Sequence, residues 1–168
     1  GILPIHNVGV TATGRIPSGG LGLHYIAELS NGRTSRSPLN EPVQNVVDEN
    51  NGKAVNFGLF VRPDRLQGLQ AGFSVYHDRL TPAALPKIDQ TILAAHVVYV
   101  RPTFEWLNEA IVIRHAPSGS GVVFHTPAFY TQVSRRFAGV RPYFRDEYVN
   151  ASSGEPIFSD VGRRDGPS

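Results

Sequence analysis

Between residues 54 and 80, apolar and polar positions alternate with a period of two in two arms on either side of a tight corner at 63–68. Such alternation is typical of β-strands with one apolar and one polar face, and helical spacing fits neither arm. The two arms therefore predict a hairpin, and about 9–11 residues is also the length of a tilted barrel strand that crosses a bilayer. The apolar positions are Val55, Phe57, Leu59, Val61, Leu69, Ala71, Phe73 and Val75.

The same alternation recurs along the chain and predicts eight strands. The fold class that follows is all-β, an antiparallel up-and-down β-barrel segment that occupies residues 1–168 as one unit. The arm at 104–114 is the least regular, because Asn108 falls on its apolar face, and a short helix is an alternative there. The predicted strands lie near 7–16, 21–30, 54–62, 69–79, 90–100, 104–114, 128–137 and 140–149.

Short and long connections between the predicted strands alternate. Tight corners fall near 17–20, 63–68, 101–103 and 138–139, whereas polar loops fall at 31–53, 81–89 and 116–121, followed by a polar tail at 151–168. Short turns on one side and long loops on the other are the layout of outer-membrane barrels. Aromatic residues near strand ends fit the interfacial girdles of such barrels: Tyr25, Tyr99, Phe104, Trp106, Phe137 and Tyr148.

Composition narrows the choice of class. Of the 168 residues, 40% are hydrophobic and only 18% are charged, below the roughly 25% of an ordinary soluble domain. The net charge of +2 without a basic cluster argues against nucleic acid as a partner. There is no cysteine, so disulfide and cysteine–metal scaffolds are excluded, and no apolar run is long enough for a transmembrane helix. The absence of Met, also at position 1, indicates a processed chain or a fragment.

The sequence offers little that points to catalysis or to a cofactor. Its six histidines show neither i, i+4 nor H-E-x-x-H spacing, so polar residues of the lumen are favoured over metal ligands. His24 and His96 fall on inward faces of separate strands, whereas His77, His115 and His125 are expected at strand ends or in loops and His6 precedes the first strand. Residues 118–121 lack the G-x-S-x-G frame and are interpreted as a flexible loop, and the acidic stretch at 48–52 as a solvated loop tip. We therefore expect no enzyme activity, no metal and no cofactor.

The polar face of the strands is where a channel would meet its solutes. Its positive and negative side chains balance, so no strong ion preference follows. Arg136, Arg141 and Arg145 could form a wall that attracts anions, but pairing with neighbours such as Glu147 is the favoured interpretation. The expected pore-lining residues are Arg15, His24, Glu28, Asn56, Arg62, Gln70, Tyr76, Asp78, His96, Glu105, Glu109, Gln132, Arg136, Arg141, Tyr143, Arg145 and Glu147.

Three segments resemble bacterial outer-membrane barrels of the porin type, and the phosphate-selective porin-like group in particular. They are Arg-Pro-Asp-Arg-Leu-Gln-Gly-Leu-Gln at 62–70, Phe-Tyr-Thr-Gln-Val-Ser-Arg-Arg-Phe at 129–137 and Arg-Pro-Tyr-Phe-Arg at 141–145. The resemblance implies a Gram-negative outer membrane, a signal peptide, and passive diffusion of small hydrophilic solutes, some of them anionic. It also implies outer-membrane lipid as a partner, with a homo-oligomer such as a trimer as an option for the full-length protein.

Two features depart from that pattern. The chain lacks the C-terminal strand with an aromatic last residue, and it stops where a ninth strand would begin, so we expect an internal segment of a larger barrel. Asp146 would face lipid between Phe144 and Tyr148, which puts the register of the last strand in doubt.

Two other classes of protein remain open. A soluble lipocalin- or avidin-like barrel would enclose Phe57, Leu59, Phe73 and Val75 in a closed core around a small ligand. An outer-membrane adhesin or enzyme would act through the long loop at 31–53.

Overall fold

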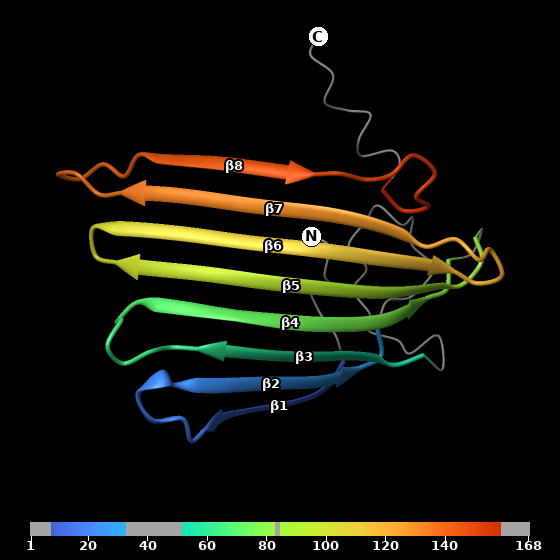
Figure 1. Ribbon diagram of the computed structural model, residues 1–168, viewed down its shortest axis with the longest axis horizontal. Coiled ribbons are helices and arrows are strands. Elements are labelled where there is room, and N and C mark those ends of the chain that lie inside the picture. Colours follow the sequence, from blue (N-terminus) through green and yellow to red (C-terminus); the bar gives the residue numbers. More distant parts are fainter. Residues whose placement is uncertain (1–7, 33–51, 83–84, 159–168) are drawn as a thin grey trace, which may run out of the picture.

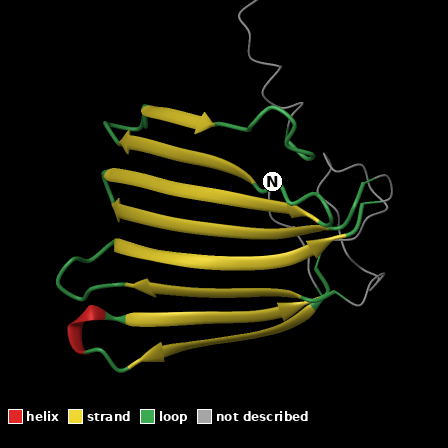
Figure 2. Cartoon of the chain, turned by 45° about the vertical axis from the view of Figure 1, so that its right-hand side comes forward, coloured by secondary structure: helices red, strands yellow, loops and turns green. Residues whose placement is uncertain are grey.

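The computed structural model describes residues 8–32, 52–82 and 85–158, and these residues form one antiparallel sheet of eight strands in sequence order (Figure 1). A single 3₁₀ turn, η1 (Gly19–Leu21), interrupts the described chain (Figure 2). The strands are β1 (Gly9–Ile16), β2 (Leu23–Ser30), β3 (Ala54–Val61), β4 (Leu69–Leu80), β5 (Ile88–Arg101), β6 (Phe104–Pro117), β7 (Phe124–Arg135) and β8 (Tyr143–Val149).

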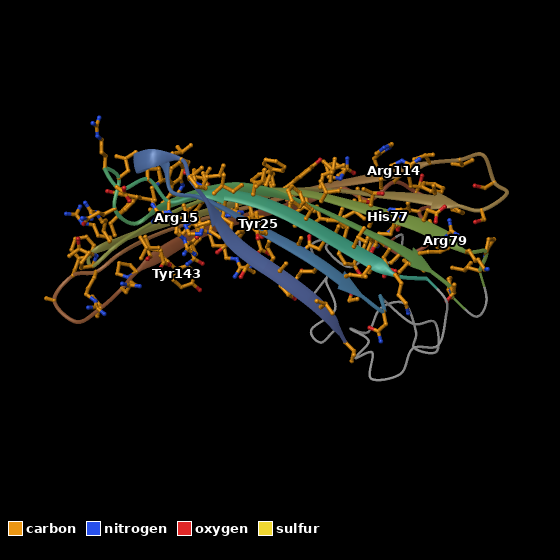
Figure 3. All side chains as sticks on the ribbon, turned by 90° about the horizontal axis from the view of Figure 1, so that it is seen from below. Arg15, Tyr25, His77, Arg79, Arg114 and Tyr143 are labelled. Carbon is orange, nitrogen blue, oxygen red and sulfur yellow. The ribbon has the colours of Figure 1, made fainter. Side chains whose placement is uncertain are left out.

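The sheet has the predicted up-and-down topology, but it is not closed into a barrel. β1 pairs with β2 alone and β8 with β7 alone, so both outer strands have one free edge within the described residues. The sheet is twisted and arched, and side chains project from both of its faces (Figure 3). In the part of the chain that the structure describes, no helix is both long and apolar enough to cross a membrane.

The helix considered for 104–114 does not form. This segment belongs to β6, which pairs along its whole length with β5 and through twelve of its residues with β7. Backbone pairing on both sides therefore outweighs the helix propensity of its Glu, Ala and Leu residues. β7 begins at Phe124 rather than at 128 and includes Pro127, and β8 begins at Tyr143 rather than at 140.

The long connections lie at one end of the sheet, the long-loop end, and the tight ones at the other, the short-turn end (Figure 1). At the short-turn end the backbone N–H of Val100 donates to Gly68 O at 2.9 Å, which ties two neighbouring turns together. Most of the predicted loop at 31–53 falls on residues 33–51, which lie outside the described residues, as do 83–84 and 159–168.

The register defines two faces of different composition. We call one the apolar face; it carries Val10, Leu29, Phe57, Phe73 and Leu93, each of them exposed. We call the opposite one the polar face, and every buried residue of the described strands lies on it. These buried residues are Ser30, Ala54, Gly58, Tyr76, Asp78, Leu80, Ile88, Gln90, Ile92, Ile113, His115, Thr126 and Ser134.

The residues that a soluble barrel would enclose are not enclosed here. Phe57 and Phe73 are 46% and 50% exposed, and Leu59 and Val75 are half-buried on the same face. The small core lies instead on the polar face near the long-loop end, where Ala54, Tyr76, Ile92 and Ile113 pack together. Folding has thus left the larger apolar surface open.

Candidate functional site

One cross-strand row of the polar face runs through all eight strands, because the register places its members opposite one another. We call it the polar row. It brings five of the predicted pore-lining residues onto one line, and side chains directly opposite on one face lie close enough to interact. Its members, from β1 to β8, are Arg15, His24, Phe60, Gly72, His96, Glu109, Tyr130 and Glu147.

In the β2–β5 half of the sheet, stacked rings and a hydrogen-bonded chain hold the row in place. His24 stacks on Phe60 with 5.1 Å between ring centroids and 3° between planes, and the Arg62 guanidinium lies 5.0 Å from the Phe60 centroid. Arg62 Nε donates to Gln70 Oε1 at 2.8 Å, which fixes the orientation of the Gln70 amide. Gln70 Nε2 must then donate to His96 Nε2 at 3.0 Å, so the proton of a neutral His96 ring resides on Nδ1.

Gly72 leaves this part of the face room for larger neighbours. A Cβ at this position would lie 2.6 Å from Leu59 O and from Phe60 Cβ, and 3.0 Å from His96 Cε1. The absence of a side chain at Gly72 therefore allows Phe60 and His96 to approach each other across β4. A hollow of about 580 Å³ opens beside this group at the short-turn end, lined by Arg62, Gln70 and Val98 among others.

Glu28 sits two rows closer to the long-loop end than the polar row and is held by its neighbours on both sides. It accepts hydrogen bonds from Asn56 Nδ2 at 2.6 Å and from Thr11 Oγ1 at 3.4 Å. Farther along, Tyr76 donates its hydroxyl to Asp78 Oδ2 at 3.1 Å in a buried position. The carboxylates of this half of the polar face therefore have hydrogen-bond donors within the sheet.

Two ion pairs join acids and arginines in the β6–β8 half. Arg141 Nη1 lies 3.6 Å from Glu105 Oε2, and Arg145 forms an ion pair with Glu147. The Arg145 guanidinium also lies 4.8 Å from the centroid of the Tyr130 ring. Arg141 and Arg145 thus each lie beside a carboxylate, whereas Arg136, the third arginine of the wall considered from the sequence, follows β7 and hydrogen-bonds through its backbone N–H to Thr103 O at 2.9 Å.

The expected pore-lining residues of the strands all fall on the polar face by register, and three arginines lie just beyond the strands. Arg62 follows β3 and reaches Gln70, whereas Arg136 and Arg141 lie in the connection between β7 and β8. Gln132 donates to Glu105 Oε1 at 3.4 Å, and Tyr143 lies opposite Ser134. Figure 3 shows Arg15 and Tyr143 toward the short-turn end.

Sequence reasoning missed two ring residues of the row and one buried polar group. Phe60 and Tyr130 occupy polar-face positions, and only their place in the alternation could have indicated that they stack with His24 and Arg145. His115 was expected at a strand end or in a loop, but it is a buried residue of β6. Among the described residues, no three His, Asp or Glu side chains gather as ligands for a metal ion.

This arrangement offers a broad surface of paired charges, amides and ring faces that can exchange hydrogen bonds with water and hydrophilic solutes. Comparison of the chain with known protein families, with curated proteins and with solved structures gives no match.

Proposed function

We propose that this chain forms part of the wall of a porin-type β-barrel in a bacterial outer membrane, through which small hydrophilic solutes diffuse. One observation carries the proposal. All buried strand residues lie on the polar face, while the apolar face is exposed on every strand. Exposed apolar patches on water-soluble proteins are normally limited to a few hundred Å², so a hydrocarbon environment is the natural partner of this face.

The distribution of charge on the apolar face supports the same proposal. His77, Arg79 and Arg114 belong to this face by register and lie toward the long-loop end (Figure 3). Arg101 and Arg135 belong to the same face and lie at the short-turn end, as the last residues of β5 and β7. An apolar band with charged margins matches a bilayer core between two polar interfaces, and β4 to β7, with 12–14 residues each, are long enough to span it when tilted.

Aromatic residues border this band on the short-turn side. Tyr99 and Trp106 are directly opposite each other on β5 and β6, and Phe144 of β8 continues the same row through Val133. Tyr99 also meets the Phe104 ring at a centroid distance of 6.2 Å. Tyr and Trp side chains favour the membrane–water interface, which supports a girdle at this level.

The polar face would then line the aqueous interior of the barrel. It carries charges of both signs, and two ion pairs, Arg145–Glu147 and Arg141–Glu105, join some of them, which favours general diffusion with at most a modest preference for anions. The free edges of β1 and β8 require further strands or further copies to complete the barrel, because unpaired backbone groups are costly in lipid.

Two adjacent alanines of β5 allow a matched test. Ala95 is exposed on the apolar face, and Ala94 lies on the polar face beside it. In the full-length protein folded into lipid vesicles, Ala95→Arg should lower the free energy of unfolding by about 2–4 kcal/mol, whereas Ala94→Arg should lower it much less. Equal costs for the two variants would contradict a lipid-facing apolar surface.

Planar-bilayer recordings on the full-length protein separate a channel from an adhesin or an enzyme. Stepwise conductance that depends on the protein is the expected result. A protein that stays folded and monomeric in detergent-free buffer and gives no conductance would favour a soluble ligand-binding barrel instead.

A further inference from the structure

The chain does not leave the sheet after β8 but folds back onto the polar face at the long-loop end. The backbone N–H of Asn150 donates to Pro127 O at 3.0 Å, and that of Glu155 donates to Ser152 O at 3.1 Å in a turn. These contacts direct residues 150–158, which we call the strap, toward β5 and β6. The sequence had suggested only a polar tail here.

Glu155 anchors the strap through a carboxylate that is fully buried. Its Oε1 atom lies 2.5 Å from His115 Nδ1, and both side chains are at most 1% exposed. Its Oε2 atom accepts the backbone N–H of Ile157 at 2.9 Å and also that of Phe158. Burial of a carboxylate is unfavourable unless hydrogen bonds replace those it makes with water, and here three donors do so.

His115 is itself fixed from the sheet side. Its Nε2 atom lies 2.6 Å from Gln90 Nε2 on β5. An amide nitrogen only donates, so His115 Nε2 accepts and Nδ1 carries the proton that is donated to Glu155. The Phe158 ring stacks on His115 at 5.7 Å and packs against the small core around Ile113.

We propose that the strap is an internal gate which narrows the aqueous path along β5 and β6 at the long-loop end, and that the Glu155–His115 contact is its latch. The docked position of the strap stands on the contacts above. The narrowing of a path rests on the proposed function, because only in a barrel is the polar face an aqueous interior. The Phe158 ring against the small core and the buried Glu155 carboxylate hold this segment against the sheet at two points.

The docking itself is tested without reference to transport. Within this chain, which has no cysteine, single cysteines can be introduced at Ile157, which is half-buried, and at Ser153, which is exposed. Any cysteines elsewhere in the full-length protein are first replaced by serine. In the full-length protein, a membrane-impermeant maleimide should label Ile157→Cys about tenfold more slowly than Ser153→Cys. Equal labelling rates at the two positions, with Glu155 intact, would contradict the docking of the strap on the sheet.

Release of the latch is tested with two variants. Glu155→Gln keeps the shape of the side chain but replaces one acceptor oxygen by a donor, and His115→Phe keeps the ring for Phe158 but removes the donor to Glu155. Each should bring the labelling rate at position 157 to within about twofold of that at 153, since local opening sets the rate. Unchanged protection in both variants would show that the Glu155–His115 contact does not hold the strap.

The role as a gate is tested by single-channel conductance. Glu155→Gln should increase the conductance of the full-length protein, whereas the control Asp89→Asn should not. Asp89 precedes Gln90 in β5 but lies on the apolar face, where it pairs with Arg79 at 2.7 Å. If Glu155→Gln raises the labelling rate at position 157 but leaves the conductance unchanged, the strap is not a gate. A protein with no conductance at all would contradict the proposed function and leave labelling to decide the docking.

Discussion

The Arg145 guanidinium forms an ion pair with the Glu147 carboxylate on the polar face of β8, and Asp146 between them lies on the apolar face. Both partners of the pair are about half exposed, so the pair stabilises the sheet by at most about 1 kcal/mol. In the channel proposed above, the pair would matter more for transport than for stability, because it neutralises a cationic group that would otherwise attract anions. The alternation of β8 thus separates two acids that adjoin each other in sequence into two different environments.

Substitution of Glu147 should change ion selectivity. Glu147→Gln leaves Arg145 without its carboxylate partner, so the wall gains net positive charge and the full-length channel should shift toward anions. The reversal potential across a bilayer in a KCl gradient measures this shift. Asp146→Asn is the matched control, because it removes one negative charge from the same strand on the opposite face and should leave the reversal potential unchanged. A shift of equal size for both variants would show that the faces are assigned wrongly.

Asp146 should instead affect stability. It lies on the apolar face in one row with Thr131 and Asn108, whose side chains hydrogen-bond at 2.7 Å. In the proposed membrane orientation, a carboxylate on this face is unfavourable, although less so than a basic residue, which costs about 2–4 kcal/mol. Asp146→Asn should therefore stabilise the protein in lipid vesicles and raise its free energy of unfolding by about 1 kcal/mol. A loss of stability would indicate that a partner, and not lipid, covers this row.

A side chain at Gly68 in the tight corner should destabilise the protein more than one at Gly119. Gly68 has φ +84°, and a Cβ there would overlap the carbonyl oxygen of Val100. Gly119 has a similar φ of +79°, but a Cβ there would meet open space. Gly119→Ala should cost about 1 kcal/mol for its backbone conformation alone, and Gly68→Ala about 2–3 kcal/mol. Denaturant titration of the two folded variants measures the difference, and equal costs would contradict the contact with Val100.

Two neighbouring residues of β6 should respond differently to truncation. Ile113 is 1% exposed within the small core, whereas Val112 is 38% exposed on the apolar face. Ile113→Ala should lower the free energy of unfolding by about 2–5 kcal/mol because it leaves a cavity. Val112→Ala should cost at most about 1 kcal/mol in vesicles, where lipid chains fill the space. A larger cost at Val112 than at Ile113 would mean that the core lies on the other face.

Alternation of apolar and polar residues was sufficient to predict the architecture. A period of two assigns a face to each strand residue. Asn108 and Thr131 are polar, but they keep this period and lie opposite each other on the apolar face. The helix alternative at 104–114 failed because propensity is local, whereas β6 is held by strands on both sides. Pro127 concealed the start of β7, since proline usually marks a strand end.

The partners of individual side chains were not accessible from the sequence. The pairing of Arg141 with Glu105 joins the β7–β8 connection to β6, and the pairing of Glu155 with His115 joins residues separated by 40 positions. Such contacts depend on register and on the path of a non-repetitive segment, which no periodicity encodes. Two consecutive apolar residues, Ile157 and Phe158, stand out in the polar tail, and the second of them packs against the small core.

The missing contact between β1 and β8 bears on the width of any opening that this sheet borders. With about 4.8 Å between neighbouring strands, the eight strands provide roughly 38 Å of circumference without meeting each other. A cylinder that includes them must therefore be wider than the narrow barrels of the same strand number, whose interiors are filled by side chains. Its bore would have room for a column of water as well as for the hydrated molecules that cross it.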